Sequence, residues 1–223
     1  MKVLIAGASG LVGKTLIKLL LNSDRTSSVI SIVRKSMNID HKKLVEKIID
    51  FDNLETELDA INVEVAYCCL GTTIKKAGTK ENFEKVDLHY PLRLAEHLHD
   101  LGTNQFNIIT AIGSNPNSSF YYNRIKGKVE EKLRAVGFTA LNIFRPSLLI
   151  GNREEHRVGE KLAIAGSKVF NPFLFGPFKK YRGIKSEDVA MAMMVVGLDQ
   201  SCQGMNIFES DKIQSLADLS NSE

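Results

Sequence analysis

The sequence predicts an α/β fold in which a doubly wound parallel sheet is followed by a small C-terminal lobe. Short apolar runs rich in β-forming residues alternate with longer helical patterns through the first 145 residues. Several of these runs are apolar without alternation, which is typical of parallel strands covered by helices on both faces. Repeated strand–helix–strand units imply right-handed crossovers. We therefore expect one domain over residues 1–223, with residues 146–223 contributing the lobe.

Each element has its own signal in the sequence. The expected strands are Lys2–Ala6, Val29–Val33, Val45–Ile49, Val63–Leu70, Gln105–Thr110 and Thr139–Phe144. The expected helices between them are Leu11–Leu21, Glu81–Leu101 and Ser118–Val136. Pro91 should kink or divide the second helix, and Gly102 and Gly137 stand where C-terminal caps belong. In the lobe we expect a helix near Ser186–Leu198, capped by Ser186, and a short strand near Met205–Phe208.

Composition excludes several classes of protein. With 43% hydrophobic and 25% charged residues, the chain is neither disordered, collagen-like nor a disulfide scaffold. Its 29 basic and 26 acidic residues leave a net charge of only +3, and the basic residues are scattered, so no nucleic-acid partner is expected.

The cysteines and apolar stretches bear on the compartment. Two of the three cysteines, Cys68 and Cys69, are adjacent, which favours reduced core thiols over a disulfide. The longest apolar stretch, Val189 to Leu198, has roughly half the length of a membrane span. The N-terminus enters a strand at once and shows no cleavable signal pattern. These features predict a cytoplasmic protein without a membrane segment.

A glycine-rich turn, Gly7-Ala8-Ser9-Gly10-Leu11-Val12-Gly13, follows the first strand and opens the first helix. In dinucleotide-binding folds the first glycine of such a turn makes the tight bend, and the second lets pyrophosphate approach the backbone. The third allows the helix to pack on the strand, and the helix N-terminus faces the phosphates. The predicted cofactor contacts here are Gly7, Ser9, Gly10, Leu11, Val12 and Gly13.

A competing motif overlaps this turn. The segment Ala8 to Thr15 matches a phosphate-binding P-loop except that alanine replaces the first glycine, which would make Lys14 and Thr15 ligands of nucleotide and magnesium. Gly7 at the strand end favours the dinucleotide instead. A purely structural glycine turn is the third interpretation.

The end of the second strand bears on the choice of cofactor. NAD-preferring folds place an acidic residue there to bind the ribose 2′-hydroxyl. Here the strand ends in Arg34-Lys35, and no acidic residue follows until Asp40. A guanidinium can bind a 2′-phosphate by charge-assisted hydrogen bonds, so Arg34 and Lys35 predict NADP(H).

A tyrosine and a lysine follow the fifth strand. Tyr122 and Lys126 are four residues apart and so share one face of a helix, whereas Tyr121 does not share that face. An ammonium beside a phenol favours the phenolate, which suits the tyrosine to proton transfer. A hydroxyl at the end of the preceding strand would orient a substrate carbonyl. A solvated helical pair is the alternative.

The sequence resembles atypical short-chain dehydrogenases/reductases, and within them the Tat-interacting-protein oxidoreductase group. The resemblance runs from residue 1 to about residue 159 and more loosely beyond. The segments that carry it are Gly7–Gly13, Asp50-Phe51, Cys68–Thr73, Lys76–Gly78, Val86-Asp87, Tyr122–Gly127 and Phe144–Pro146.

The resemblance implies roles for particular residues. Tyr122 would be the general acid/base, and Lys126 would bind the nicotinamide ribose. Thr110 would occupy the catalytic hydroxyl position, where the family usually carries serine, which leaves Ser114 as a rival. The resemblance places Leu70, Gly71, Thr72 and Thr73 at the ribose and pyrophosphate, Asp50 and Phe51 at the adenine, and Pro146, Leu148 and Leu149 on the nicotinamide side.

Other conspicuous residues are given structural interpretations. The five histidines lack the partners of a zinc site, so no metal is expected. The charge run Arg153–Arg157 is interpreted as solvated surface rather than substrate contact. The residues Phe170, Phe173, Phe175 and Phe178 are interpreted as the core of the lobe rather than the wall of a pocket.

The sequence thus predicts an NADP(H)-dependent oxidoreductase that acts on a small carbonyl or hydroxyl compound. A non-catalytic NADPH-binding redox-sensing regulator, for which a protein partner stays open, is the first alternative. A nucleotide-sugar epimerase or dehydratase is the second, and it ranks lower because only 78 residues follow Arg145. The substrate is a small molecule, with neither nucleic acid nor membrane as a partner.

Overall fold

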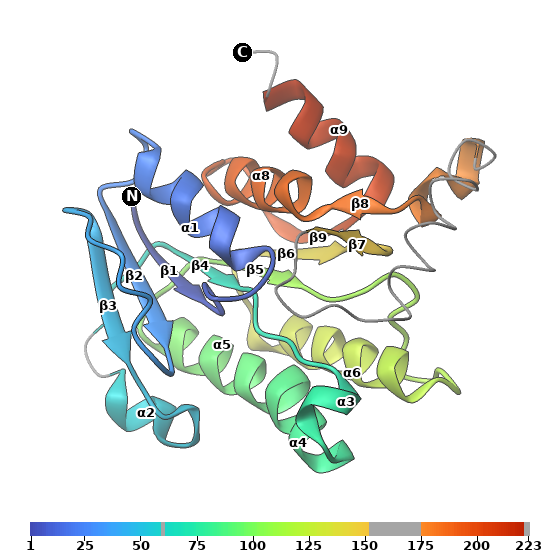
Figure 1. The fold of residues 1–223 in the computed structure, drawn as a ribbon, viewed down its shortest axis with the longest axis horizontal. Helices are drawn as coiled ribbons and strands as arrows, with labels where there is room; N and C mark the ends of the chain where they lie inside the picture. Colours follow the sequence, from blue (N-terminus) through green and yellow to red (C-terminus); the bar gives the residue numbers. More distant parts are fainter. Residues whose placement is uncertain (59–60, 152–174, 221–223) are drawn as a thin grey trace.

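The structure is a computed structural model that describes residues 1–58, 61–151 and 175–220. Its centre is a seven-stranded sheet in the order β3-β2-β1-β4-β5-β6-β9, with every neighbouring pair parallel (Figure 1). The strands are β1 (Lys2–Ala6), β2 (Ser28–Val33), β3 (Leu44–Ile48), β4 (Val65–Cys68), β5 (Gln105–Ile109), β6 (Ala140–Arg145) and β9 (Gly204–Glu209). The predicted doubly wound parallel sheet is confirmed.

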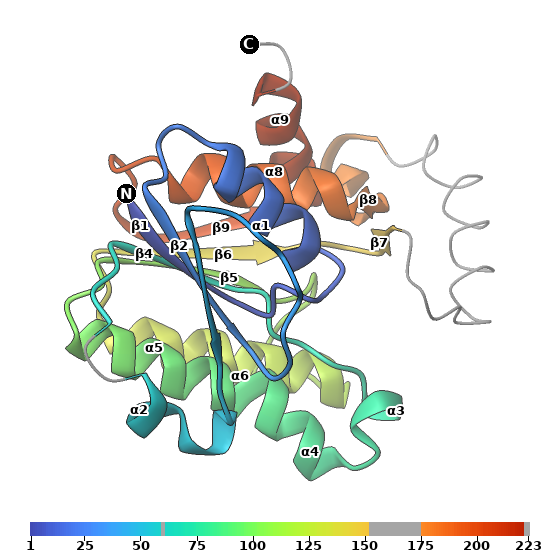
Figure 2. The same ribbon diagram turned by 60° about the vertical axis from the view of Figure 1, so that its left-hand side comes forward.

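Helices cover both faces of the sheet (Figures 1 and 2). One face carries α1 (Gly13–Asn22) and α8 (Ser186–Gly197), with α9 (Ser210–Ser220) beside α8, and the other carries α5 (Tyr90–Asp100) and α6 (Tyr121–Val136). Strand β1 contributes side chains to the cores on both faces of the sheet, because successive side chains of a strand point to opposite faces. Leu4 and Ala6 join the core under α5 and α6, while Val3 and Ile5 join the core under α1 and α8.

The remaining elements are short. They are η1 (Phe51–Asn53), α2 (Leu54–Glu57), α3 (Ile74–Ala77), α4 (Lys80–Glu84), η2 (Lys85–His89), η4 (Gly176–Tyr181), and the two-stranded sheet of β7 (Leu149–Ile150) and β8 (Ile184–Lys185). Among the described residues, no helix combines the length and apolar character needed to cross a bilayer. All three cysteines are free thiols, as predicted.

The predicted helix at Glu81–Leu101 is divided, as Pro91 requires. The π-helical turn η2 separates α4 from α5, and Pro91 lies in the first turn of α5. Because proline has no N–H, the carbonyl of Asp87 lacks its ordinary α-helical donor. The side chain of Asp87 is buried within this turn. Short π segments of this kind often occur at functional sites.

Helix ends agree in part with the sequence. Gly137 adopts the left-handed conformation, with φ of 93°, and ends α6 as predicted. The capping role expected for Ser186 is wrong: Lys185 is the N-cap, and the Ser186 hydroxyl donates to Glu187 instead of accepting from the first turn.

The C-terminal part is more closely integrated than the predicted small lobe. Helix α8 completes one cover of the main sheet, and β9 is its seventh strand. Three buried or half-buried asparagines fix the register of β9. Asn142 donates to Asn107 at 3.0 Å and Asn206 donates to Asn142 at 3.1 Å, across three neighbouring strands.

Candidate functional site

The glycine turn lies where the sheet changes winding direction. From β1 the chain continues to β2 and β3 on one side, and then crosses to β4 on the other. Ligands of doubly wound sheets bind at the carboxyl ends of strands at such a switch point.

Two of the three glycines stand where the main chain packs too closely for any side chain. Gly7 has φ of 82°, and a Cβ there would lie 2.6 Å from the main chain of Cys69. A Cβ on Gly13 would lie 2.2 Å from the carbonyl oxygen of Gly7. The N–H of Gly10 donates to the same carbonyl at 3.0 Å. The turn therefore brings the start of α1 against β1 and β4, which is the arrangement expected of a dinucleotide cradle.

A basic cavity of about 730 Å³ adjoins this turn. Arg34 and Lys35 at the end of β2 form one wall, and Lys14 and Lys18 on α1 form another. Its full lining is Ala8, Ser9, Lys14, Ile17, Lys18, Arg34, Lys35, Ser36, Met37 and Ile39, with no acidic residue. This charge favours an anionic ligand beside the glycine turn.

The catalytic candidates lie on α6. Lys126 is buried, and its Nζ lies 2.7 Å from Oδ1 of Asp87 on η2. Burial by itself lowers the pKa of Lys126, but the neighbouring Asp87 carboxylate outweighs it, so that the pKa is raised. Tyr122 belongs to the same helix face, with 37% of its surface exposed, and its ring lies 5.8 Å from that of Phe83. The site thus combines an exposed phenol with a buried ammonium whose pKa is raised.

The two adjacent tyrosines differ in their contacts. The hydroxyl of Tyr121 donates to Glu84 at 3.0 Å and also contacts the carbonyl of Lys80. Burial and the hydrogen bond to Glu84 raise the pKa of Tyr121 to about 12. The Tyr121 hydroxyl is therefore engaged within the protein, which leaves Tyr122 as the candidate acid/base.

The turn after β4 connects the cofactor side to this pair. The N–H of Thr72 donates to Oδ2 of Asp87 at 2.8 Å, so one carboxylate holds both the turn and Lys126. A Cβ on Gly71 would lie 3.5 Å from Asp87 Oδ1 and 3.9 Å from Lys126 Nζ. The turn after β4 therefore lies close to both charged groups. Thr73 caps α3 by accepting from the N–H of Lys76. Leu70 packs at the edge of the core.

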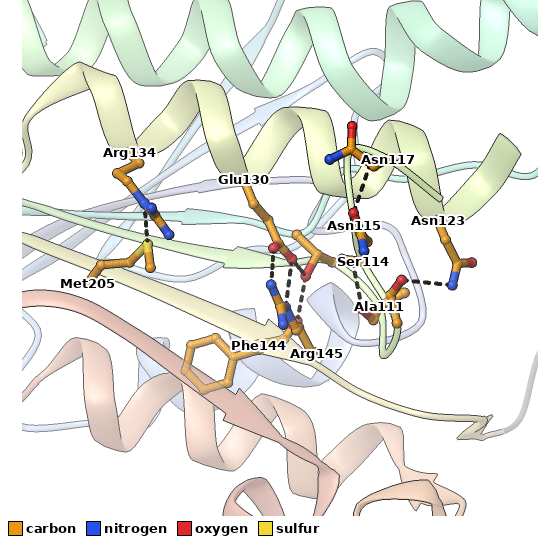
Figure 3. A network of polar contacts seen from close by, with 12 residues as sticks. Ala111, Ser114, Asn115, Asn117, Asn123, Glu130, Arg134, Phe144, Arg145 and Met205 are labelled. Carbon is orange, nitrogen blue, oxygen red and sulfur yellow. Dashed lines mark hydrogen bonds and ion pairs between the residues drawn. The ribbon is translucent and has the colours of Figure 1, made fainter. Parts of the chain in front are cut away.

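Thr110 directly follows β5 and Ser114 lies in the turn beyond it, and both hydroxyls are engaged. Figure 3 shows Ser114 beside Ala111 and Arg145 beside Glu130. Thr110 is buried and donates to Oε1 of Glu130 at 2.5 Å. Arg145 forms an ion pair with the same carboxylate, its Nε at 3.0 Å from Oε1. Ser114 donates to the carbonyl of Ala111 at 2.6 Å. Thr110 is thus held by a charged acceptor and Ser114 by a neutral one.

Other predicted contacts are placed less favourably or lie elsewhere. The side chain of Phe51 is buried against Tyr90 in the core, so only its main chain is available to a ligand, while Asp50 is exposed and caps η1. Val12 is buried as well, and Leu11 packs close to Gly151.

The segment after β6 is fixed through its main chain. The carbonyl of Pro146 accepts from Ile112, that of Leu148 accepts from Ile184, and Leu149 pairs with Ile184 in the small sheet. Arg153–Arg157, Phe170 and Phe173 lie outside the described residues. Phe175 and Phe178 are exposed, contrary to their interpretation as core.

Two residues of the site were not predicted as such. From the sequence, Asp87 is given no role beyond its place in the Val86-Asp87 segment of the resemblance, and Glu130 is given no role. A signal was present for Glu130, since it stands four residues after Lys126 and so shares its helix face. Nothing local marks Asp87 as the partner of Lys126, because they are 39 positions apart in the sequence. No described group of histidine, cysteine and acidic side chains has the arrangement of a metal site.

Comparison with known proteins decides the family. The pattern of the NAD dependent epimerase/dehydratase family matches residues 3–121. The chain belongs to this family. Within it, the rat protein HTATIP2 is 38% identical over 165 residues, which are 72% of this chain and 68% of that protein. This relative confirms the predicted resemblance to the Tat-interacting-protein group of atypical short-chain dehydrogenases/reductases.

Family members of known structure share the fold. The human epimerase family protein SDR39U1, solved with NADPH, superposes with a TM-score of 0.61 at 19% identity, covering 94% of this chain and 74% of that one. The chain is therefore a member of the NAD dependent epimerase/dehydratase family, and it has a Rossmann-like sheet.

The predicted cytoplasmic location is wrong by the same comparison. FMP52 of Eremothecium gossypii, 28% identical over 228 residues and all of both chains, is named a mitochondrial protein, as are further fungal family members. The prediction failed because reduced cysteines and a strand at the N-terminus occur in proteins of more than one compartment. These features therefore do not distinguish a cytoplasmic from a mitochondrial protein.

Proposed function

We propose that this protein is an NADP(H)-dependent oxidoreductase that moves a hydride to or from a carbonyl or hydroxyl group of a small molecule. The observation that carries the proposal is the pairing of the exposed Tyr122 with the buried Lys126 on one face of α6. The pair stands after β5, at the carboxyl edge of the sheet where the glycine turn also lies.

The chain's own residues fit a dinucleotide. The turn at Gly7 and Gly13 has no room for a side chain, so α1 starts close against β1 and β4. The N-terminus of α1 would then bind the pyrophosphate through its main-chain N–H groups. Arg34 and Lys35 face the basic cavity, where they would hold a 2′-phosphate. When bound, the nicotinamide supplies the hydride chemistry.

Residues of α6 and η2 would then handle the proton. Tyr122 gives a proton to the substrate oxygen in reduction and takes it back in oxidation. Lys126 stays protonated because Asp87 is its counter-ion, and its ammonium both favours the phenolate and offers donors to ribose hydroxyls. Ser114 or Thr110 would orient the substrate oxygen by a hydrogen bond.

A panel of carbonyl compounds, followed by the loss of NADPH absorbance, tests this function. We expect turnover in the wild type that falls by roughly 10²-fold in Tyr122→Phe, the usual contribution of a positioned proton donor, with little change in NADPH affinity. Tyr121→Phe is the matched control and should keep its activity. An active wild type that is indifferent to Tyr122→Phe would remove this tyrosine from the mechanism.

The family match supports a second candidate, a nucleotide-sugar epimerase or dehydratase that uses the same tyrosine and lysine. Such an enzyme regenerates its cofactor in each cycle. Conversion of a nucleotide sugar without net consumption of dinucleotide would favour it over the reductase.

A further inference from the structure

A second cavity, of about 990 Å³, lies between the segment from η4 to β8 and the first turns of α9. Its lining runs from Phe208 near the carboxyl end of β9 into α9, which packs beside α8. Its lining shares no residue with the basic cavity at the glycine turn. The residues that matter for the argument are Lys179, Arg182, Ser210, Asp211 and Lys212.

The charge of this second cavity is predominantly positive. Lys179, Arg182 and Lys212 line it together with one acidic residue, Asp211. Among the described residues, no carboxylate lies within ion-pair distance of these three cations; the neighbouring Glu209 is paired with Lys180 at 3.1 Å. A concave surface with excess positive charge concentrates anions.

Arg182 is the most constrained of the three cations. Its Nε is buried without a hydrogen-bond partner among the described residues, and its guanidinium lies 5.8 Å from the centre of the Phe175 ring. Its carbonyl oxygen accepts from the Ser147 hydroxyl. A buried N–H without an acceptor is costly, and an anion would supply the acceptor.

Hydrogen bonds connect the cavity to the expected nicotinamide side. Ser147 stands inside the Pro146–Leu149 segment. Its N–H donates to Oγ of Ser210 at 2.8 Å, and the Ser210 hydroxyl donates back to Ser147 Oγ at 3.0 Å. Two walls of the cavity, at Arg182 and Ser210, are therefore bonded to one residue of that segment.

We propose that this cavity is a second anion site, which binds a small molecule bearing a carboxylate or phosphate group, with Arg182 as the main contact and Lys179 and Lys212 as supporting charges. A guanidinium can hold such a group by two parallel hydrogen bonds.

Calorimetric titration of the NADPH-saturated protein with inorganic phosphate and with succinate tests the cavity, because the cofactor then occupies the other basic cavity. We expect at least one of these anions to bind the wild type and to bind at least about tenfold more weakly to Arg182→Gln. Lys128→Gln, an exposed site on α6, is the charge-matched control and should bind like the wild type. Lys212→Gln provides a second cavity variant, with a smaller loss, should Arg182→Gln fold poorly.

The outcomes separate the two proposals. Failure of NADPH itself to bind would contradict the proposed function, and the same titration without cofactor would still test the cavity. Binding of neither anion to the wild type, or equal binding to the wild type and both cavity variants, would overturn the anion site.

Discussion

Lys126 Nζ lies 2.7 Å from Asp87 Oδ1, and both side chains are almost completely removed from solvent, at 5% and 1% exposure. The second oxygen of Asp87 accepts from the N–H of Thr72. One carboxylate from a π-helical turn therefore holds the candidate catalytic lysine and the cofactor-side turn after β4 in a fixed relation.

Asp87→Asn should lower the free energy of unfolding by about 3–5 kcal/mol near pH 7, because it leaves a buried ammonium without its counter-ion. Asp52→Asn is the matched control. It breaks the Lys85–Asp52 pair, whose side chains are nearly half exposed and screened by solvent, and should cost far less than Asp87→Asn. Urea unfolding of the three proteins measures both effects, and equal losses in the two variants would contradict the structural role of Asp87.

The loss of unfolding free energy caused by Asp87→Asn should depend on pH. The raised pKa of Lys126 in the folded wild type means that the pair's stabilisation is complete below the unfolded pKa, about 10.4, and is lost only as pH rises through the folded pKa. Without Asp87, burial disfavours the ammonium, so the variant gains stability as its lysine deprotonates below about pH 10. The difference between the two proteins should therefore shrink from about pH 7 to about pH 10. A constant difference would show that Lys126 is not the titrating partner.

The hydroxyls of Thr110 and Ser114 should respond differently to removal. To bind a substrate oxygen, the Ser114 hydroxyl has to break only one hydrogen bond, to the neutral carbonyl of Ala111. Ser114→Ala should therefore lower turnover by about 10²-fold with little loss of stability. Thr110→Val should instead lower the free energy of unfolding by about 1–3 kcal/mol, because it takes a donor from the buried Glu130, and should change turnover only severalfold. The reverse ranking in steady-state kinetics would assign the catalytic hydroxyl to Thr110.

The glycine turn should bind a dinucleotide and not a triphosphate. At about 100 times its Kd, NADPH should add about 2.7 kcal/mol to the free energy of unfolding, which raises Tm by roughly 5–10 °C for a chain of this size without magnesium. ATP with magnesium should have little effect in the same thermal scans. Magnesium-dependent stabilisation by ATP that disappears in Lys14→Ala would restore the P-loop interpretation.

Local sequence patterns predicted the central strands well because both faces of each are covered, so each strand is a mostly apolar run. Strand β1 matches its predicted bounds, and Gly137 ends α6 where a left-handed residue was expected. The glycine turn, Tyr122 and Lys126 were predictable for a similar reason, since their spacing is set within one turn or one helix.

Relations across the fold were not predictable from local patterns. Asp87 and Lys126 meet only because a π turn and α6 pack together, and the asparagine row that holds β9 joins three separate strands. Ser186 was expected to cap α8, yet its hydroxyl bonds to the neighbouring Glu187. Phe51 illustrates the limit in the site itself, because its place in a motif did not reveal that the core encloses its ring.

The proposed preference for NADPH rests on Arg34 and Lys35, which line the cavity beside the glycine turn. Removing a guanidinium that binds the 2′-phosphate should cost about 1.5–3 kcal/mol for NADPH and almost nothing for NADH, as expected of a hydrogen bond to a charged group. Arg134→Ala, at the far end of α6, is the matched control and should leave both affinities unchanged.

The Kd values of NADPH and NADH, measured for the wild type and Arg34→Ala, test the central claim most directly, because they need no knowledge of the substrate. We predict that the wild type binds both dinucleotides and prefers NADPH, and that Arg34→Ala loses most of this preference while still binding NADH. A wild type that binds neither dinucleotide, or that binds both with equal affinity, would contradict the assignment.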